Sequence, residues 1–341
     1  MTIVLLQFLF LAGVIVGAGA ALSRYADVIA ERTGLGRLVV GSVLLASITS
    51  LPELSVDIAC VRQGDPDLGV GDLLGSCLMN LLILAVLDLN AKSRGKMFSR
   101  TASGHALGGI VSISLASIVA IALIAERQLG GPTLMGLGCG VWLVLAAYLF
   151  GIRMIFLDQR IAARVASDSA NSDNAHSDGE TQSMPSLSTA IAVFVVAAIV
   201  ILFTGPRLSA VAGELADKSG LAKSFVGTTL VAISTSLPEL VTCWAAVRIG
   251  AHDLAIGNIF GSNAFNFVIL VALDVVQPGS LLAVVSQTHA ITAISVMFAT
   301  SVIIMGQLYH VERRIWFIEP DALLVILIIS GCLWLIYAIP M

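Results

Sequence analysis

Two identical segments, Thr-Ser-Leu-Pro-Glu, occur at residues 49–53 and 235–239. Each places a carboxylate, Glu53 or Glu239, inside an otherwise apolar stretch, where an unpaired charge is costly. The proline before each glutamate has no amide hydrogen, so it kinks a helix and frees a carbonyl one turn back. No Lys or Arg lies near either glutamate within its apolar stretch. A bound cation is therefore the simplest compensating partner.

Neutral oxygen-bearing side chains accompany both carboxylates. A threonine and a serine stand four and three residues before each glutamate, so all three share a helix face. A Gly-x-x-x-Gly-Ser-x-x-x-Asn motif follows in both copies, and its glycines permit close helix packing. Such hard oxygens suit Ca²⁺, Na⁺ or Mg²⁺ rather than Zn²⁺ or Cu, and two carboxylates neutralise one divalent cation. These side chains are Thr49, Ser50, Glu53, Ser76 and Asn80, and then Thr235, Ser236, Glu239, Ser262 and Asn266.

The two motifs belong to a long internal repeat. Residues 41–89 align with 227–275 at a constant offset of 186 positions without a gap, and 23 of the 49 aligned positions are identical. Apolar composition produces chance Leu and Val matches, but it does not produce the same Thr-Ser-Leu-Pro-Glu segment at a fixed offset. The repeat therefore determines the expected architecture.

The composition belongs to the membrane class. Hydrophobic residues make up 57% of the 341 positions and charged residues only 12%, with a mean hydropathy of +0.98. A net charge of −4 with no basic run gives no support to nucleic-acid binding. Spans of roughly 18–25 apolar residues are needed to cross a bilayer as helix. We expect ten spans, near 3–22, 41–63, 67–89, 104–125, 132–155, 187–206, 226–249, 253–276, 283–307 and 321–340.

The expected fold class is all-α integral membrane, with the ten helices forming two five-helix repeats. The first unit is 1–156, the second is 187–341, and a polar linker at 157–186 joins them. Five is an odd number, so the copies insert with opposite orientation. Inverted repeats are typical of secondary transporters, whose site lies near the membrane midplane between the repeats.

The positive-inside rule predicts the orientation. With both termini outside, thirteen Lys and Arg residues fall in inside loops and five in outside loops. The 157–186 linker is then cytoplasmic. The expected location is a bacterial inner (plasma) membrane.

The doubled motif resembles the α-repeats of the cation/calcium exchanger superfamily, closest to its bacterial sodium/calcium exchanger branch. The resemblance covers roughly 22–89 and 208–275. It implies that the ten side chains above are ion ligands, together with the backbone carbonyls of Ala46 and Ala232. It also implies alternating access, with Na⁺ and Ca²⁺ competing for overlapping sites.

The leading hypothesis is Na⁺/Ca²⁺ antiport at a midplane oxygen site. The alternative is H⁺/Ca²⁺ antiport, because a buried glutamate can carry protons. A cation channel is less favoured. An enzyme is not expected, because no H-E-x-x-H or G-x-S-x-G motif is present. No cofactor, nucleic-acid or protein partner is expected beyond the transported ions and the lipid bilayer.

The repeats differ at a few polar positions. Asp57 and Asp72 in the first copy align with Cys243 and Asn258 in the second. In the expected orientation both aspartates lie on the outer side of the glutamates. They predict an acidic outer vestibule that concentrates cations at the external mouth.

Overall fold

The computed structural model describes residues 2–90, 105–172, 185–219, 233–309 and 320–338. Apart from one short hairpin, the described elements are helical, as the composition predicts. The first half contains α1 Thr2–Thr33, α2 Arg37–Val39, the π-helical stretch η1 Val40–Leu45, α3 Ala46–Thr49, α4 Leu51–Arg62, α5 Pro66–Asn90, α6 Ala106–Gln128, β1 Thr133–Leu134, β2 Leu137–Gly138 and α7 Cys139–Ser172. The second half contains α8 Leu187–Ser219, α10 Leu237–Arg248, α11 His252–Val276, α12 Leu281–Val284, α13 Thr288–Tyr309 and α14 Pro320–Ala338.

Seven of the described helices are long and apolar enough to cross a membrane by themselves, and the bent pair Arg37–Thr49 and Leu51–Arg62 makes an eighth candidate. Of the two remaining expected spans, 321–340 corresponds to α14, and 226–249 includes α10 but begins outside the described residues. Large apolar side chains such as Phe10, Phe150 and Phe203 are more than half exposed on the helix surfaces. An apolar exterior of this extent suits lipid rather than water.

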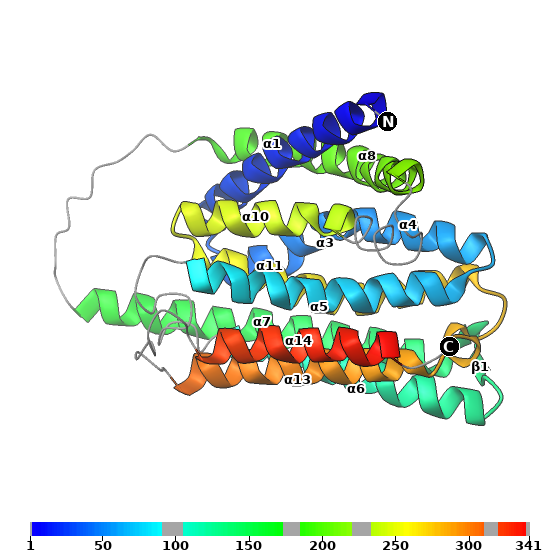
Figure 1. Ribbon diagram of the computed structural model, residues 1–341. Coiled ribbons are helices and arrows are strands. Elements are labelled where there is room, and N and C mark those ends of the chain that lie inside the picture. Colours follow the sequence, from blue (N-terminus) through cyan, green and yellow to red (C-terminus); the bar gives the residue numbers. More distant parts are fainter. Residues whose placement is uncertain (1, 91–104, 173–184, 220–232, 310–319, 339–341) are drawn as a thin grey trace.

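The helices form a layered bundle (Figure 1). α1 and α8 cross each other on one side, α6, α7, α13 and α14 occupy the other side, and α5 and α11 run through the middle. The α4–α5 turn lies at the right end of the bundle in this view, whereas the α10–α11 turn lies at the left end. α1 begins and α14 ends at the same end. Opposed turns are the arrangement that an inverted repeat requires.

Several helix boundaries differ from those expected, and one of them is that of α8, which continues to Ser219 instead of ending at residue 206. α1 continues to Thr33, well beyond residue 22, and α7 continues to Ser172, into the stretch expected to be a linker from residue 157. Polar composition does not end a helix by itself when its residues have good helix propensity. The ninth span was expected from residue 283, but α13 begins at Thr288 because the short helix α12, capped by Ser280, precedes it.

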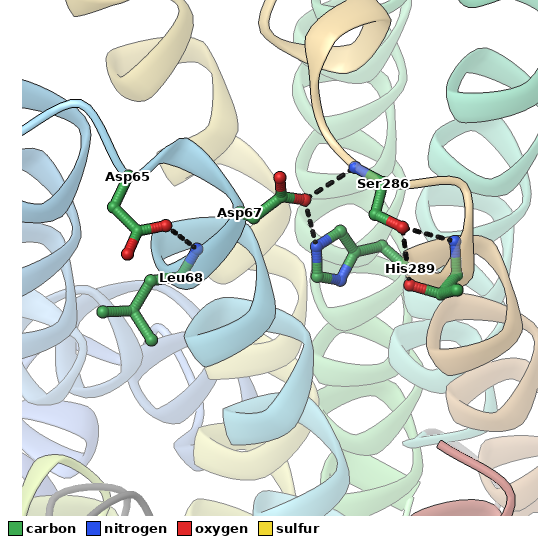
Figure 2. Close-up of polar contacts among 6 residues, drawn as sticks. Asp65, Asp67, Leu68, Ser286 and His289 are labelled. Carbon is green, nitrogen blue, oxygen red and sulfur yellow. Dashed lines mark hydrogen bonds and ion pairs between the residues drawn. The ribbon is translucent and has the colours of Figure 1, made fainter. Parts of the chain in front are cut away.

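Equivalent aspartates tie the two halves together at opposite ends of the bundle. At the start of α5, Asp67 Oδ1 lies 3.0 Å from His289 Nε2 of α13 and accepts a 2.6 Å hydrogen bond from the Ser286 amide (Figure 2). At the start of α11, the repeat counterpart Asp253 lies 3.0 Å from His105 Nε2, just before α6. Each central helix is therefore bonded to a neighbour from the other repeat.

Glycines let α11 pack directly against the η1 backbone. A Cβ on Gly41 would lie 2.6 Å from the Leu254 carbonyl oxygen, and a Cβ on Gly261 would overlap the backbone of Ser42. Real Cβ atoms do not approach backbone this closely, so only glycine fits at these two crossings. The contact fixes η1, and with it the first Thr-Ser-Leu-Pro-Glu segment, against the second repeat.

We predict that Gly261→Ala lowers the stability of the folded protein by at least about 1–3 kcal/mol, because two backbones must separate to admit the methyl group. The measurement is the thermal transition of the detergent-solubilised protein. Gly17→Ala is the matched control, since Gly17 is a helical glycine with no neighbour within 4 Å. Equal transitions for both variants would contradict the close crossing.

Candidate functional site

Both Thr-Ser-Leu-Pro-Glu segments break their helices at the serine. Ser50 (φ −87°, ψ 6°) separates α3 from α4, and Ser236 (φ −83°, ψ 4°) stands directly before α10. The bend at Ser50 is 41°. The prolines sit in the first turn of α4 and α10, where a missing amide hydrogen leaves no bond unmade. The kinks expected from the sequence are therefore present, and they start new helices whose first turns carry the glutamates.

The two glutamates are completely enclosed. Glu53 is 1% exposed and Glu239 is 0% exposed. Among the described residues, no Lys, Arg or His forms an ion pair with either of them. Ser50 Oγ of the first repeat donates to Glu239 Oε1 of the second at 3.3 Å. The remaining oxygen of each carboxylate, Oε2, has no hydrogen-bond partner within the described ranges.

Neutral oxygens and amides from both repeats surround the glutamates. Thr49 Oγ1 lies 3.3 Å from Ser262 Oγ, and Asn80 Nδ2 donates to Asn263 Oδ1 at 3.0 Å. Several buried polar atoms here have no partner among the described residues, namely Ser76 Oγ, Asn80 Oδ1, Ser236 Oγ and both amide atoms of Asn266. Unpartnered buried polar atoms are costly. Their concentration around two carboxylates fits a cation better than it fits a sealed structural core.

The donor set also limits what could bind. No group of three His, Cys, Asp or Glu side chains gathers as a metal cluster in the described part of the chain. A cation held here would need the hydroxyl and amide oxygens as well as the two carboxylates. Neutral oxygens with few carboxylates are the ligands of hard cations such as Ca²⁺ and Na⁺.

The structure brings the expected residues together from the two repeats. Thr49, Ser50, Ser76, Asn80, Thr235, Ser236, Ser262 and Asn266 are all buried with the glutamates. The Ala46 carbonyl, expected as a ligand, accepts hydrogen bonds from Thr49 Oγ1 (3.2 Å) and the Ser50 amide (3.1 Å). Ala232 lies outside the described residues. The ligand role of each residue stays a prediction.

Comparison with known proteins identifies the family. The family model described as sodium/calcium exchanger protein matches residues 3–152 and 189–339. The chain belongs to this family.

Relatives and solved structures agree with that assignment. The exchanger-family chain is 30% identical over 277 residues to the Inner membrane protein YrbG of Escherichia coli, covering 80% of this chain and 81% of that protein. It is 44% identical over 59 residues to the Sodium/calcium exchanger MaX1 of Methanosarcina acetivorans, covering 17% of each. A solved structure of the sodium-calcium exchanger NCX_Mj superposes with a TM-score of 0.66 at 18% identity, covering 100% of both chains. The last likeness shows the shared membrane fold.

Two polar residues beside this site, Asn258 and Asn263, were not among the expected ligands. Asn258 accepts a 3.5 Å hydrogen bond from Thr49 and donates to Thr242 at 3.1 Å, and Asn263 bonds to Asn80. Asn258 and Asn263 stand where the repeats differ, and that difference was the only signal in the sequence. Their contacts with Thr49 and Asn80 cross between repeats, so helical spacing within one repeat does not reveal those contacts.

The structure does not show the solvated acidic mouth that was expected at Asp57 and Asp72. Asp57 is 0% exposed, and the Asp72 Oδ2 atom is shielded from solvent. Asp57 stands in the second half of α4 and Asp72 in the first third of α5, so both lie toward the α4–α5 turn. Asp57 is buried and Asp72 is partly buried, because α4 and α5 pack closely at Gly69.

We predict that Ca²⁺ raises the melting temperature of the purified protein and that Glu239→Gln abolishes this rise. A ligand that binds only the folded state stabilises it by about 2.7 kcal/mol at a concentration one hundred times its dissociation constant. Glu214→Gln is the matched control, because Glu214 is exposed and pairs with Lys218. An undiminished Ca²⁺-dependent rise in Glu239→Gln would remove that carboxylate from the site.

Proposed function

We propose that the protein is a secondary active antiporter that exchanges Ca²⁺ for Na⁺ by alternating access. The observation that carries the proposal is the pair of enclosed carboxylates, Glu53 and Glu239, each with an unpartnered oxygen and no described basic partner. Two carboxylates match the charge of one Ca²⁺. Neutral oxygens complete the shell of a divalent ion, and they can hold Na⁺ without adding charge.

The proposed architecture is ten spans in two inverted five-helix repeats, with the site at the midplane between them. The opposed turns of α4–α5 and α10–α11 support the inversion (Figure 1). The excess of Lys and Arg in one set of loops supports outside termini and a cytoplasmic linker at 157–186. The membrane proposed is the bacterial inner membrane, and the relative YrbG is named an inner membrane protein.

The family supports the choice of ions. MaX1 and NCX_Mj are both named sodium/calcium exchangers. H⁺/Ca²⁺ antiport is the second candidate, because buried carboxylates can exchange protons for Ca²⁺ in place of Na⁺. Uptake of radioactive Ca²⁺ into proteoliposomes separates the two. An outward Na⁺ gradient should drive uptake, and an outward H⁺ gradient without Na⁺ should not; the reverse result would establish the second candidate.

We predict that Glu53→Gln and Glu239→Gln each reduce Na⁺-driven Ca²⁺ uptake by about 100-fold or more. Each change keeps the shape of the side chain but removes a charged ligand, whose loss costs on the order of 3 kcal/mol. Uptake is compared at equal amounts of reconstituted protein, with Glu214→Gln as the control. Near-normal exchange by either well-folded variant would sink the two-carboxylate site.

The hydroxyl side chains should contribute in a graded way. Thr49→Ala, Ser50→Ala, Thr235→Ala and Ser236→Ala should weaken Na⁺ dependence at least as strongly as Ca²⁺ affinity, because neutral oxygens supply most of a monovalent site. Each lost bond of about 1 kcal/mol corresponds to roughly a fivefold change. The measurement is the Na⁺ and Ca²⁺ concentration dependence of exchange. Ser47→Ala, which removes only a bond to the Val43 carbonyl, is the control.

A further inference from the structure

The repeats differ most sharply at one pair of facing positions. In the second repeat, Asn258 Nδ2 donates to Cys243 Sγ at 3.3 Å across the α10–α11 hairpin. The repeat alignment places Asp57 and Asp72 at the same two positions of the α4–α5 hairpin. A neutral, bonded pair in one repeat is thus replaced by two carboxyl groups in the other.

These two carboxyl groups belong to the region where α4 and α5 pack together, with Asp57 buried and Asp72 partly buried. A Cβ on Gly69, three residues before Asp72 on α5, would lie 3.6 Å from the Asp57 Cβ, so Asp72 stands on the face of α5 that packs against Asp57. Asp57 is 0% exposed, and no donor among the described residues reaches either of its oxygens or Asp72 Oδ2. The group opposite each carboxyl is therefore another carboxyl, which has a hydrogen to donate only when it is protonated.

No described basic group neutralises the pair. On α4 the nearest ionisable groups are Glu53 and Cys60, and on α10 it is Glu239. On α13, His289 lies near Gly71 but is bonded to Asp67. The other charged side chains described on these packed helices lie elsewhere. Arg62 of α4, Arg207 of α8 and Arg248 of α10 are exposed, and Glu214 and Lys218 of α8 pair with each other. His252, Asp253 and Asp274 stand near the ends of α11.

The contact geometry selects the cation that this pair can hold. Ca²⁺ takes six to eight oxygens, and no third acidic, His or Cys ligand joins these two within the described residues. A proton needs only two oxygens in contact, and two adjacent carboxyls that cannot both ionise share one. The pair lies one helical turn from Glu53 and from Ser76, close enough to sense a charge bound there.

We propose that Asp57 and Asp72 hold one proton between them and release it when a cation occupies the site of Glu53 and Glu239. The proton leaves a carboxyl oxygen and is taken by a base in solution, so the pair gains the negative charge that the arriving cation favours. The inference rests on the proposed function, because it requires a cation at that site. It gives the first repeat a proton-binding site that the second repeat lacks.

Proton release on Ca²⁺ binding tests the proposal. Calorimetric titration of the full-length protein with CaCl₂ in two buffers of different ionisation enthalpy gives the number of protons released per Ca²⁺. The wild type should release about one proton more than Asp57→Asn/Asp72→Asn. Asp57→Cys/Asp72→Asn, which installs the pair that already packs in the second repeat, should behave like the first variant. Asp65→Asn, a change to an exposed aspartate beside α5, is the matched control and should release as many protons as the wild type.

Three other results of the titration would contradict the proposal or the function on which it rests. Equal proton release by the wild type and whichever double variant folds would exclude a proton shared by Asp57 and Asp72. The wild type could instead bind two Ca²⁺ ions and the double variant one, with equal proton release. That result would show that the pair binds a metal ion rather than a proton. A wild-type protein that binds no Ca²⁺ would instead overturn the proposed function.

Discussion

Enclosing two carboxylates inside an apolar bundle is the constraint on which the rest of this structure depends. Among the described residues, no basic side chain pairs with Glu53 or Glu239. Their surroundings must therefore supply polar partners at membrane depth. An unbroken helix cannot do so, because its backbone groups bond to one another. The breaks at Ser50 and Ser236 turn the chain just before each glutamate and bring hydroxyl groups beside it. Proline at the start of the next helix has no amide hydrogen, so the two helices cannot join into one regular helix.

Each repeat completes the polar surroundings of the other, as the proposed inverted arrangement requires. Ser50 bonds to Glu239, Thr49 contacts Ser262, and Asn80 bonds to Asn263, so every one of these contacts joins the first repeat to the second. Neither half has a complete oxygen shell by itself. The proposed ion shell therefore depends on the relative position of the repeats, and a small shift between them would change the ligands that an ion meets. This dependence couples binding to conformation, as alternating access requires.

Structural features that depend on local sequence or on the internal repeat could be predicted from the sequence. The helical membrane fold, the kinks at the Thr-Ser-Leu-Pro-Glu segments and the convergence of the polar residues follow from composition, proline chemistry and the offset of 186. Contacts across the repeats were not predictable, because no periodicity within one helix encodes the position of another. Asn258 was missed for that reason, and Asp57 was expected near solvent because an alignment carries no information on burial. The extension of α7 to Ser172 was missed because polarity alone was read as a linker.

The ties at the ends of the bundle indicate where such a shift can take place. Asp67 bonds to α13 at one end and Asp253 bonds next to α6 at the other, so both central helices are anchored to the opposite repeat. Glycine contacts further fix α11 against η1. Ser50 and Ser236, by contrast, interrupt their helices and carry no capping hydrogen bond from their own side chains. The opening that alternating access proposes would therefore cost least at these two breaks, where a rotation of α4 or α10 would move a glutamate without breaking the anchors of α5 and α11.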